Sequence, residues 1–168
     1  MNRRSPLLET SATDGGPRRE PELRLDAYLP YRLSTAASAV TSLIARAYQD
    51  RFNLTIPQWR LMSVLAEDGP STEAELVART VMDKGIVAEA ANGLERRDLV
   101  SRGPNGDAVA LTPSGTGLYG EIAPLALAYE AALIAGLAPD EVKLLKRLLA
   151  RLQSAAGQLA GDTDQPRG

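Results

Sequence analysis

Two short helices followed directly by a β-hairpin constrain the fold more than any other feature of the sequence. Thr72-Glu73-Ala74-Glu75 has the form of a capping box, in which the Thr72 hydroxyl accepts from the amide of Glu75 and the Glu75 carboxylate accepts from the amide of Thr72. The pattern predicts a short helix that ends near Arg79-Thr80. After a tight turn, Asp83 is expected to cap a longer helix. Its inward residues are predicted to be Ile86, Val87, Ala90 and Leu94.

The hairpin is predicted from two short segments, residues 99–102 and 108–111, and from the loop between them. That loop contains Asn105-Gly106, a strong hairpin signal because both residue types tolerate a positive φ angle. Two helices joined by a tight turn and followed by a hairpin make a winged helix-turn-helix. The expected fold class is therefore mainly α, an α+β winged helix.

Two helices are predicted before this module. The first runs from Pro30, which suits the first turn of a helix, to about Arg51. The second is capped by Thr55 and stops at Gly69-Pro70. Its apolar stripe comprises Trp59, Met62, Leu65 and Ala66.

Two more helices are predicted after the hairpin. One runs from about Thr116 to Ile134 with a kink at Pro124, and the last begins at Pro139. The first and last helices of the chain carry long apolar stripes, which are expected to pack against a second chain; packing within one chain is the alternative. The stripes comprise Leu33, Ala37, Val40, Ile44 and Ala47, and then Val142, Leu145, Leu148 or Leu149, and Leu152.

The composition excludes several classes of function. The 168 residues include 19 Lys and Arg against 21 Asp and Glu, and a net charge of -2 does not suit nonspecific coating of nucleic acid. There is no Cys and no His, which removes thiol chemistry, disulfides and the usual zinc ligands. No apolar run approaches the roughly 20 residues that span a bilayer, and no secretory signal is visible. We expect a cytoplasmic protein with no cofactor and no membrane contact.

Four segments together resemble the MarR family of transcriptional regulators. They are Leu54-Thr55-Ile56-Pro57-Gln58-Trp59-Arg60, Met82-Asp83-Lys84, Gly93-Leu94-Glu95-Arg96-Arg97-Asp98-Leu99-Val100 and Leu111-Thr112-Pro113-Ser114-Gly115. A narrower set is similar to the branch of the family that represses aromatic-acid and hydroxycinnamate catabolism. It comprises Tyr31-Arg32-Leu33-Ser34 together with Ile56-Pro57-Gln58-Trp59-Arg60 and Met82-Asp83-Lys84. The resemblance implies a homodimer on a double-stranded DNA operator. The helix from Asp83 would enter the major groove and the wing would reach the minor groove.

The resemblance also implies a division of the chain into five segments. Residues 25–53 would be the N-terminal dimerisation helix, residues 54–115 the winged helix-turn-helix and residues 116–160 the C-terminal dimerisation helices. Residues 1–24 and 161–168 have the composition of disordered tails.

The sequence departs from the family's pattern where DNA is read. The position at which the family carries an Arg in mid-helix is Glu89, and no Arg follows Asp107 in the wing. Between Thr55 and Thr112, nine acidic residues stand against six basic ones. The basic residues are Arg60, Arg79, Lys84, Arg96, Arg97 and Arg102, and the acidic ones are Glu67, Asp68, Glu73, Glu75, Asp83, Glu89, Glu95, Asp98 and Asp107. DNA-binding modules normally have a basic face. The predicted fold therefore favours DNA binding, whereas the acidic charge of this module does not.

Five residues are predicted to contact DNA. Ser71 and Thr72 would bind phosphate through their hydroxyls and the helix N-terminus, and Lys84 would bind phosphate by charge. Ile86 would touch a base, for example a thymine methyl group, and Arg102 would act near the wing. In the alternative interpretation, Thr72 is a plain helix cap and Lys84 is a solvated lysine of the first helical turn.

A ligand cleft is expected, as in the family, between the dimer helices and the winged module. Aromatic side chains beside a fixed guanidinium suit a small aromatic acid or its CoA ester. The predicted lining residues are Tyr28, Tyr31, Arg32, Ser38, Trp59 and Met62, with Arg60 beside them. In the alternative interpretation, Trp59 anchors the core and Arg32 is a surface charge.

The predicted function is that of a ligand-responsive homodimeric regulator, a repressor that releases its operator when an aromatic acid or its CoA ester binds. The alternative is a protein-binding or anti-regulator module on a winged-helix scaffold, with weakened or lost DNA binding. Such a module would present Glu89, Glu95 and Asp98 to a basic partner. An enzyme is not expected, because the sequence has no phosphate-binding loop, nucleophile elbow or paired-carboxylate motif.

Overall fold

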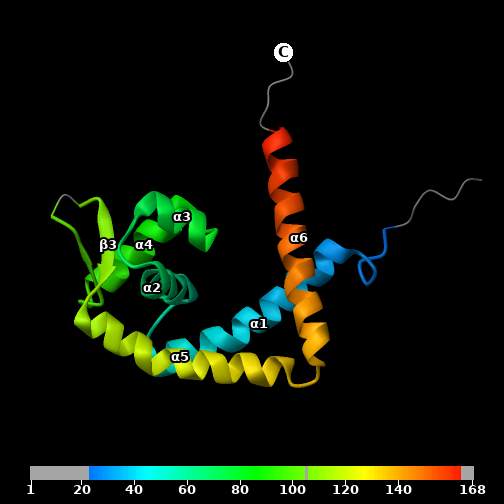
Figure 1. The fold of residues 1–168 in the computed structure, drawn as a ribbon, viewed down its shortest axis with the longest axis horizontal. Coiled ribbons are helices and arrows are strands. Elements are labelled where there is room, and N and C mark those ends of the chain that lie inside the picture. The colour runs from blue at the N-terminus through cyan, green and yellow to red at the C-terminus, as the bar shows by residue number, and fades with distance from the viewer. Residues whose placement is uncertain (1–22, 105, 164–168) are drawn as a thin grey trace, which may run out of the picture. The chain divides into compact units, whose positions relative to one another are not determined.

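The computed structural model describes residues 23–104 and 106–163 (Figure 1). It divides after Ser42 into two units. The first unit contains a turn, in which the amide of Ala27 donates to the carbonyl of Arg24, and the first part of α1 (Leu29–Phe52). Residues 23–40 are all exposed. The predicted tails at residues 1–22 and 164–168 lie outside the described residues, as does Asn105 of the predicted hairpin loop.

The second unit contains the end of α1 and the predicted winged module. Within the described residues its further elements are α2 (Ile56–Asp68), β1 (Ser71–Thr72), α3 (Glu73–Thr80), α4 (Lys84–Glu95), β2 (Val100–Arg102), β3 (Ala108–Leu111), α5 (Pro113–Ile134) and α6 (Pro139–Thr163). α2 packs against both α3 and α4, and the β2–β3 hairpin follows α4 (Figure 1). The mainly α winged helix-turn-helix is therefore confirmed.

Local signals in the sequence set the ends of α2 and α3. The Thr55 hydroxyl accepts from the amide of Gln58 at 3.3 Å, and the Gln58 side chain accepts from the amide of Thr55 at 3.0 Å. Gly69 ends α2 with a φ of 81°, a conformation that residues with a side chain rarely adopt. The capping box at Thr72 also forms, and α3 ends at Thr80 as predicted.

A small antiparallel sheet supports the wing. Its strand order is β1-β3-β2, with Ser71 opposite Val109 and Val100 opposite Leu111. The hairpin is as predicted except that Leu99 precedes the strand. β1 was not predicted, because two residues after Gly69-Pro70 are too short to show an alternating pattern.

The core lies where α1, α2, α4 and α5 meet the sheet. Trp59 stacks on Tyr119 of α5 with ring centroids 5.4 Å apart, and it also packs on Tyr48 of α1 at 5.1 Å. The largest fully buried side chains in the described part of the chain are Tyr48, Leu54, Leu61, Met62, Leu76, Leu94, Ile122 and Val87. This aromatic stack joins the end of α1 and the start of α5 to the winged module.

Four local predictions need correction. α5 begins at Pro113 rather than at Thr116, because the Thr112 hydroxyl accepts from the amide of Gly115 at 3.0 Å and so caps the helix earlier. Asp83 occupies the N-cap position of α4 but makes no capping hydrogen bond with its side chain. Ile86 is 41% exposed rather than inward. α6 continues through Thr163, into the segment predicted as a disordered tail.

In the described part of the chain, no single helix has the length and apolar content needed to cross a bilayer. Among the described helices, α5 and α6 taken together have that length and apolar content. The two helices are bent by 106° at the break between them.

Candidate nucleic-acid interface

The segment that leads into α3 carries two of the residues predicted to bind phosphate. The Ser71 side chain is buried, and its hydroxyl donates to the carbonyl of Gly69 at 3.0 Å. The Thr72 hydroxyl donates to the Glu75 carboxylate at 2.8 Å and accepts from the Glu75 amide at 3.3 Å. Thr72 therefore caps α3, as the capping-box pattern predicted. Because both hydroxyl protons are used within the protein, a phosphate here would have to be met by backbone amides.

The hydrogen bonds of the capping box also act on the Glu75 carboxyl. The amide of Thr72 donates to Glu75 Oε2 at 2.7 Å. Backbone and then side-chain hydrogen bonds from Thr72 lower the pKa of Glu75 below its ordinary value, because they stabilise the charged form.

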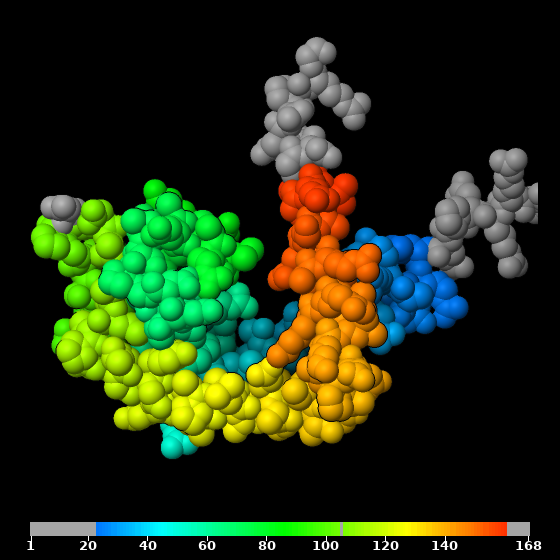
Figure 2. Space-filling view, viewed as in Figure 1, coloured from blue at the N-terminus to red at the C-terminus, as the bar shows by residue number. Residues whose placement is uncertain are grey.

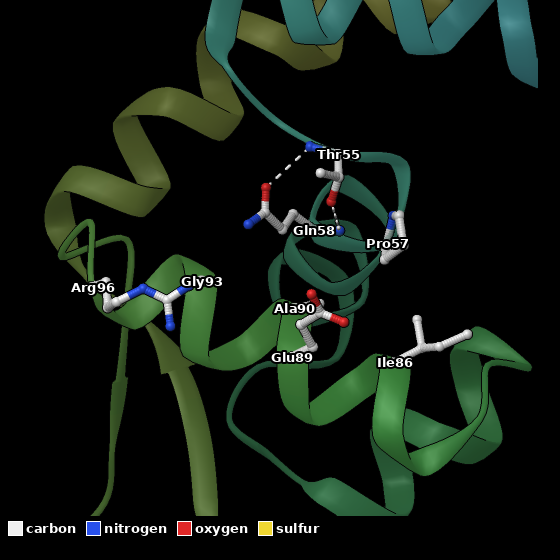
Figure 3. Close-up of a pocket in the computed structure, with 8 residues that line it drawn as sticks. All are labelled: Thr55, Pro57, Gln58, Ile86, Glu89, Ala90, Gly93 and Arg96. Atoms are coloured by element: carbon white, nitrogen blue, oxygen red, sulfur yellow. Dashed lines mark hydrogen bonds between the residues drawn. The ribbon is translucent and has the colours of Figure 1, made fainter.

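One face of α4 is exposed. Gly85, Glu89, Asn92 and Arg96 are all exposed, and their spacing along the helix places them on one side. The opposite side, which includes Val87, Ala90, Ala91 and Leu94, is buried. Ile86 lies beside the exposed face, toward the start of α2 (Figure 3). Its exposure leaves it available for the predicted contact with a base.

Lys84 stands at the start of α4 with a side chain that is 80% exposed. Its Nζ lies 3.9 Å from the Glu73 carboxylate. An ion pair this open contributes little and breaks easily, since water screens both charges. The geometry is therefore compatible both with a solvated lysine and with a lysine that turns to a phosphate.

Arg102, the basic residue of the wing, is held against α4. Its Nε donates to Glu95 Oε2 at 3.2 Å, and its Nη2 donates to Asn92 Oδ1 at 2.9 Å. This contact was not predicted from the sequence, because its two acceptors lie on α4 rather than on the strand that carries Arg102. Arg102 therefore ties β2 to α4 in this structure, and it would have to leave these partners to reach DNA.

The other basic residues of the module are mostly paired as well. Arg79 contacts Asp68 at 2.6 Å and Glu67 at 3.2 Å, and these neighbours raise its pKa, the hydrogen bond to Asp68 most. Arg97 donates to the carbonyls of Asn53 and Phe52 at 2.7 and 3.0 Å, which ties the end of α4 to the end of α1. Among the described residues, the guanidinium groups of Arg60 and Arg96 have no hydrogen-bond or ion-pair partner.

A small hollow of about 200 Å³ separates the start of α2 from the exposed face of α4 (Figure 3). Thr55, Gln58, Glu89 and Arg96 contribute polar groups to its wall. The Gln58 side chain packs over Gly93, where a Cβ would lie 2.5 Å from Gln58 Nε2. Gly93 thus permits the close approach of α2 and α4 that shapes this hollow.

The residues predicted to bind a ligand fall into two sets. Tyr28, Tyr31, Arg32 and Ser38 are exposed in the first unit. Trp59 and Met62 belong to the core of the second unit, and Trp59 does anchor it, as the alternative interpretation held. Met62 has no exposed surface, which contradicts its prediction as a lining residue, because it faces the core cluster.

Trp59 nevertheless borders an open hollow on the outer side of α2. The hollow has a volume of about 420 Å³ and is lined on α2 by Trp59, Arg60 and Ser63. Arg79, Thr80 and Val81, at the end of α3, form the facing wall. Arg60 was predicted from the sequence to lie beside the ligand-binding residues. The end of α3 was not predicted to line this hollow, because that segment is distant from α2 in sequence.

Comparisons with known proteins agree with this geometry. Residues 52–108 match the sequence profile of the MarR family. A MarR/EmrR family regulator from Acinetobacter sp. ADP1 shares the fold with a TM-score of 0.76 at 23% identity, over 81% of this chain and 99% of that chain. No protein among those with curated descriptions matches the sequence.

Two further solved structures are more similar in sequence. A probable transcriptional regulator from Pseudomonas aeruginosa is 28% identical, with a TM-score of 0.67 over 77% of this chain and 99% of that chain. NadR in complex with 4-hydroxyphenylacetate is 27% identical, with a TM-score of 0.69 over 79% of this chain and 99% of that chain.

Proposed function

We propose that this chain is a homodimeric repressor of the MarR family that binds a specific double-stranded DNA operator, because residues 52–108 match the family's model. The family and its solved members are transcriptional regulators rather than enzymes. The observation that carries the proposal is the exposed face of α4 beside a hairpin wing, on a fold shared with those regulators. In this proposal α4 enters the major groove and the wing approaches the minor groove.

A mobility-shift assay with a duplex from the chain's own promoter tests DNA binding. We expect a shift at low salt that weakens as salt rises, because phosphate contacts release counterions. A random duplex of equal length is the control, and it should compete poorly. The absence of a shift at low salt contradicts the proposal.

Exposed leucines on α6 support the dimer. α6 is drawn orange to red in Figure 2, and Val142 is its one partly covered residue between Pro139 and Ala160. Leu144, Leu145, Leu148, Leu149 and Leu152 are each 40 to 43% exposed. A stripe of this kind is costly to leave in water, and a second copy would cover it. Residues 25–53 and 116–160 would then form the dimerisation helices around the reading module at residues 54–115.

Sedimentation measurements test the dimer. The double variant Leu145→Glu and Leu148→Glu should shift the protein to monomers, because it buries two charges in the interface. Ser154→Glu, on the other side of the same helix, adds a charge away from the stripe and should leave the dimer intact. Monomeric wild-type protein at all concentrations contradicts this part of the proposal.

The effector in this proposal is a small aromatic acid or its CoA ester. The hollow beside Trp59 has room for an aromatic ring, and Arg60, without an ion-pair partner among the described residues, would meet the carboxylate. The similar regulator NadR is known in complex with 4-hydroxyphenylacetate, an acid of this class. Release of the operator would follow if the ligand favours a dimer geometry that does not fit DNA.

Thermal unfolding with 4-hydroxyphenylacetate and a phenolic CoA ester tests the effector. A ligand that binds the folded state raises the melting temperature. Arg60→Ala should abolish the shift, whereas Arg147→Ala on α6 should not change it. Equal shifts in the wild type and in Arg60→Ala contradict this site.

A second function is favoured by the paired arginines. Arg79, Arg97 and Arg102 are engaged within the module, which leaves few cations for phosphate. The module would then bind a basic protein, such as a DNA-binding paralogue, through its acidic side chains. Size-exclusion chromatography with such a paralogue discriminates: a heteromer together with no DNA binding favours this second function.

A further inference from the structure

We propose that Glu89 and Asn92 form a base-reading pair on α4 that selects a C·G base pair in the major groove. This inference rests on the proposed DNA binding and adds the residues and the base that they recognise. The two side chains are exposed and lie one helical turn apart on the same face. Residues at this spacing are neighbours on a helix surface.

The orientation of the Asn92 amide follows from its contact with Arg102. Arg102 Nη2 donates to Asn92 Oδ1 at 2.9 Å. A guanidinium only donates hydrogen bonds, so the side-chain oxygen of Asn92 must face it and the NH₂ group must point elsewhere. Arg102 is itself fixed by Glu95 at 3.2 Å. Asn92 thus offers a donor, rather than an acceptor, to a partner outside the protein.

Glu89 offers the opposite chemistry. Its carboxylate has no hydrogen-bond or ion-pair partner among the described residues, whereas Glu73, Glu75 and Glu95 each have one. An ionised carboxylate only accepts hydrogen bonds and is repelled by phosphates. Within a major groove, the carboxylate is therefore best placed against an amino group on a base edge. The standard base partner of Glu is the N4 amino group of cytosine.

The neighbours of Glu89 allow such an approach. Gly85 precedes it by one turn and Ala88 adjoins it, so no long side chain on that part of the face holds the helix away from the groove floor. A C·G pair presents the N4 amino donor of cytosine next to the O6 and N7 acceptors of guanine. An acceptor at Glu89 and a donor at Asn92 are complementary to those two edges.

The test is selection of bound sequences from a randomised duplex library at low salt, with the full chain. The wild type should enrich a motif with a C·G pair at one position of each half-site. Glu89→Ala should lose the preference there, by a factor on the order of tenfold, while the rest of the motif remains. Glu89→Gln should move the preference toward adenine, because an amide pairs with adenine N6 and N7.

Glu121→Ala is the matched control, since it removes an exposed carboxylate from α5 and alters net charge equally. It should leave the motif unchanged. If the wild type and Glu89→Ala select the same motif at every position, Glu89 is only a solvated side chain. That result overturns the inference and leaves the proposed function intact. If the wild type enriches no motif at low salt, the proposed function itself fails.

Discussion

Arg102 on β2 donates to the Glu95 carboxylate on α4 at 3.2 Å, so the basic residue nearest the wing is tied to the helix expected to read DNA. Arg102 also donates to the side-chain oxygen of Asn92 on the same helix, at 2.9 Å. The side chains of Arg102 and Glu95 are 31% and 42% exposed, so water reaches the pair. Such a pair contributes little stability, but it fixes the wing relative to α4.

Glu95→Ala should strengthen DNA binding. The substitution removes a negative charge and frees Arg102 from one of its two partners, and one added phosphate contact steepens the dependence of log affinity on log salt by about one unit. Titrations of a fluorescent duplex at several salt concentrations measure this slope. Glu121→Ala is the control for charge alone and should not steepen it. Weaker binding in Glu95→Ala, with the fold retained, would mean that Arg102 acts only by positioning the wing.

Gly115→Ala should destabilise the protein by about 2 kcal/mol or more, because adding atoms to a tight site forces the backbone to move. A Cβ at this position would overlap the carbonyl oxygen of Leu99, which cannot rotate away since it accepts from the amide of Thr112 at 3.1 Å. Gly117→Ala is the control on the same helix. Its Cβ would meet no atom within 4 Å, and it should be neutral or stabilise by up to about 1 kcal/mol. Urea denaturation of the two variants gives both values, and equal stabilities would contradict the predicted clash.

The elements that depend on local contacts were predictable from the sequence. The caps at Thr55 and Thr72 join residues three positions apart, so their patterns can be recognised without a fold. The Asn-Gly signal likewise placed the hairpin, although Asn105 itself lies outside the described residues. These elements sufficed for the winged helix-turn-helix.

Contacts that join separate elements were not predictable from the sequence. β1 exists because Ser71 pairs with Val109, and Arg102 is held by Glu95 and Asn92 across the gap between hairpin and helix. The exposure of Ile86 was missed for a related reason. Helical spacing alone allows Ile86 on the edge of the buried face, and only the packing of α2 against α4 decides that it stays outside.

Glu75→Gln should change how stability depends on pH. Hydrogen bonds from Thr72 lower the pKa of Glu75 in the folded state from its ordinary value of 4.5. A group with a lowered folded pKa contributes stability above the unfolded value and loses it as pH falls through the folded value. The wild type should therefore lose more stability than Glu75→Gln when pH falls from about 6 to about 3.

Melting temperatures across that range measure the difference. Glu121→Gln, which removes an exposed carboxylate that has no hydrogen-bond partner among the described residues, should follow the wild type. Parallel curves for the wild type and Glu75→Gln would show that the capping box does not contribute to acid sensitivity.

Val81→Gly should stabilise the folded chain. Val81 lies in the turn between α3 and α4 with φ 54° and ψ 40°, a left-handed conformation that a β-branched residue adopts at a cost. Its side chain is 85% exposed, so little packing is lost when it is removed. Glycine relieves the strain but is more flexible when unfolded, and the net gain should be about 1 kcal/mol. Val81→Ala is the control, because it removes the branched side chain but keeps the Cβ, and it should gain less than glycine. Denaturant unfolding ranks the three proteins, and a glycine variant less stable than the alanine variant would mean that the backbone at this turn is not strained.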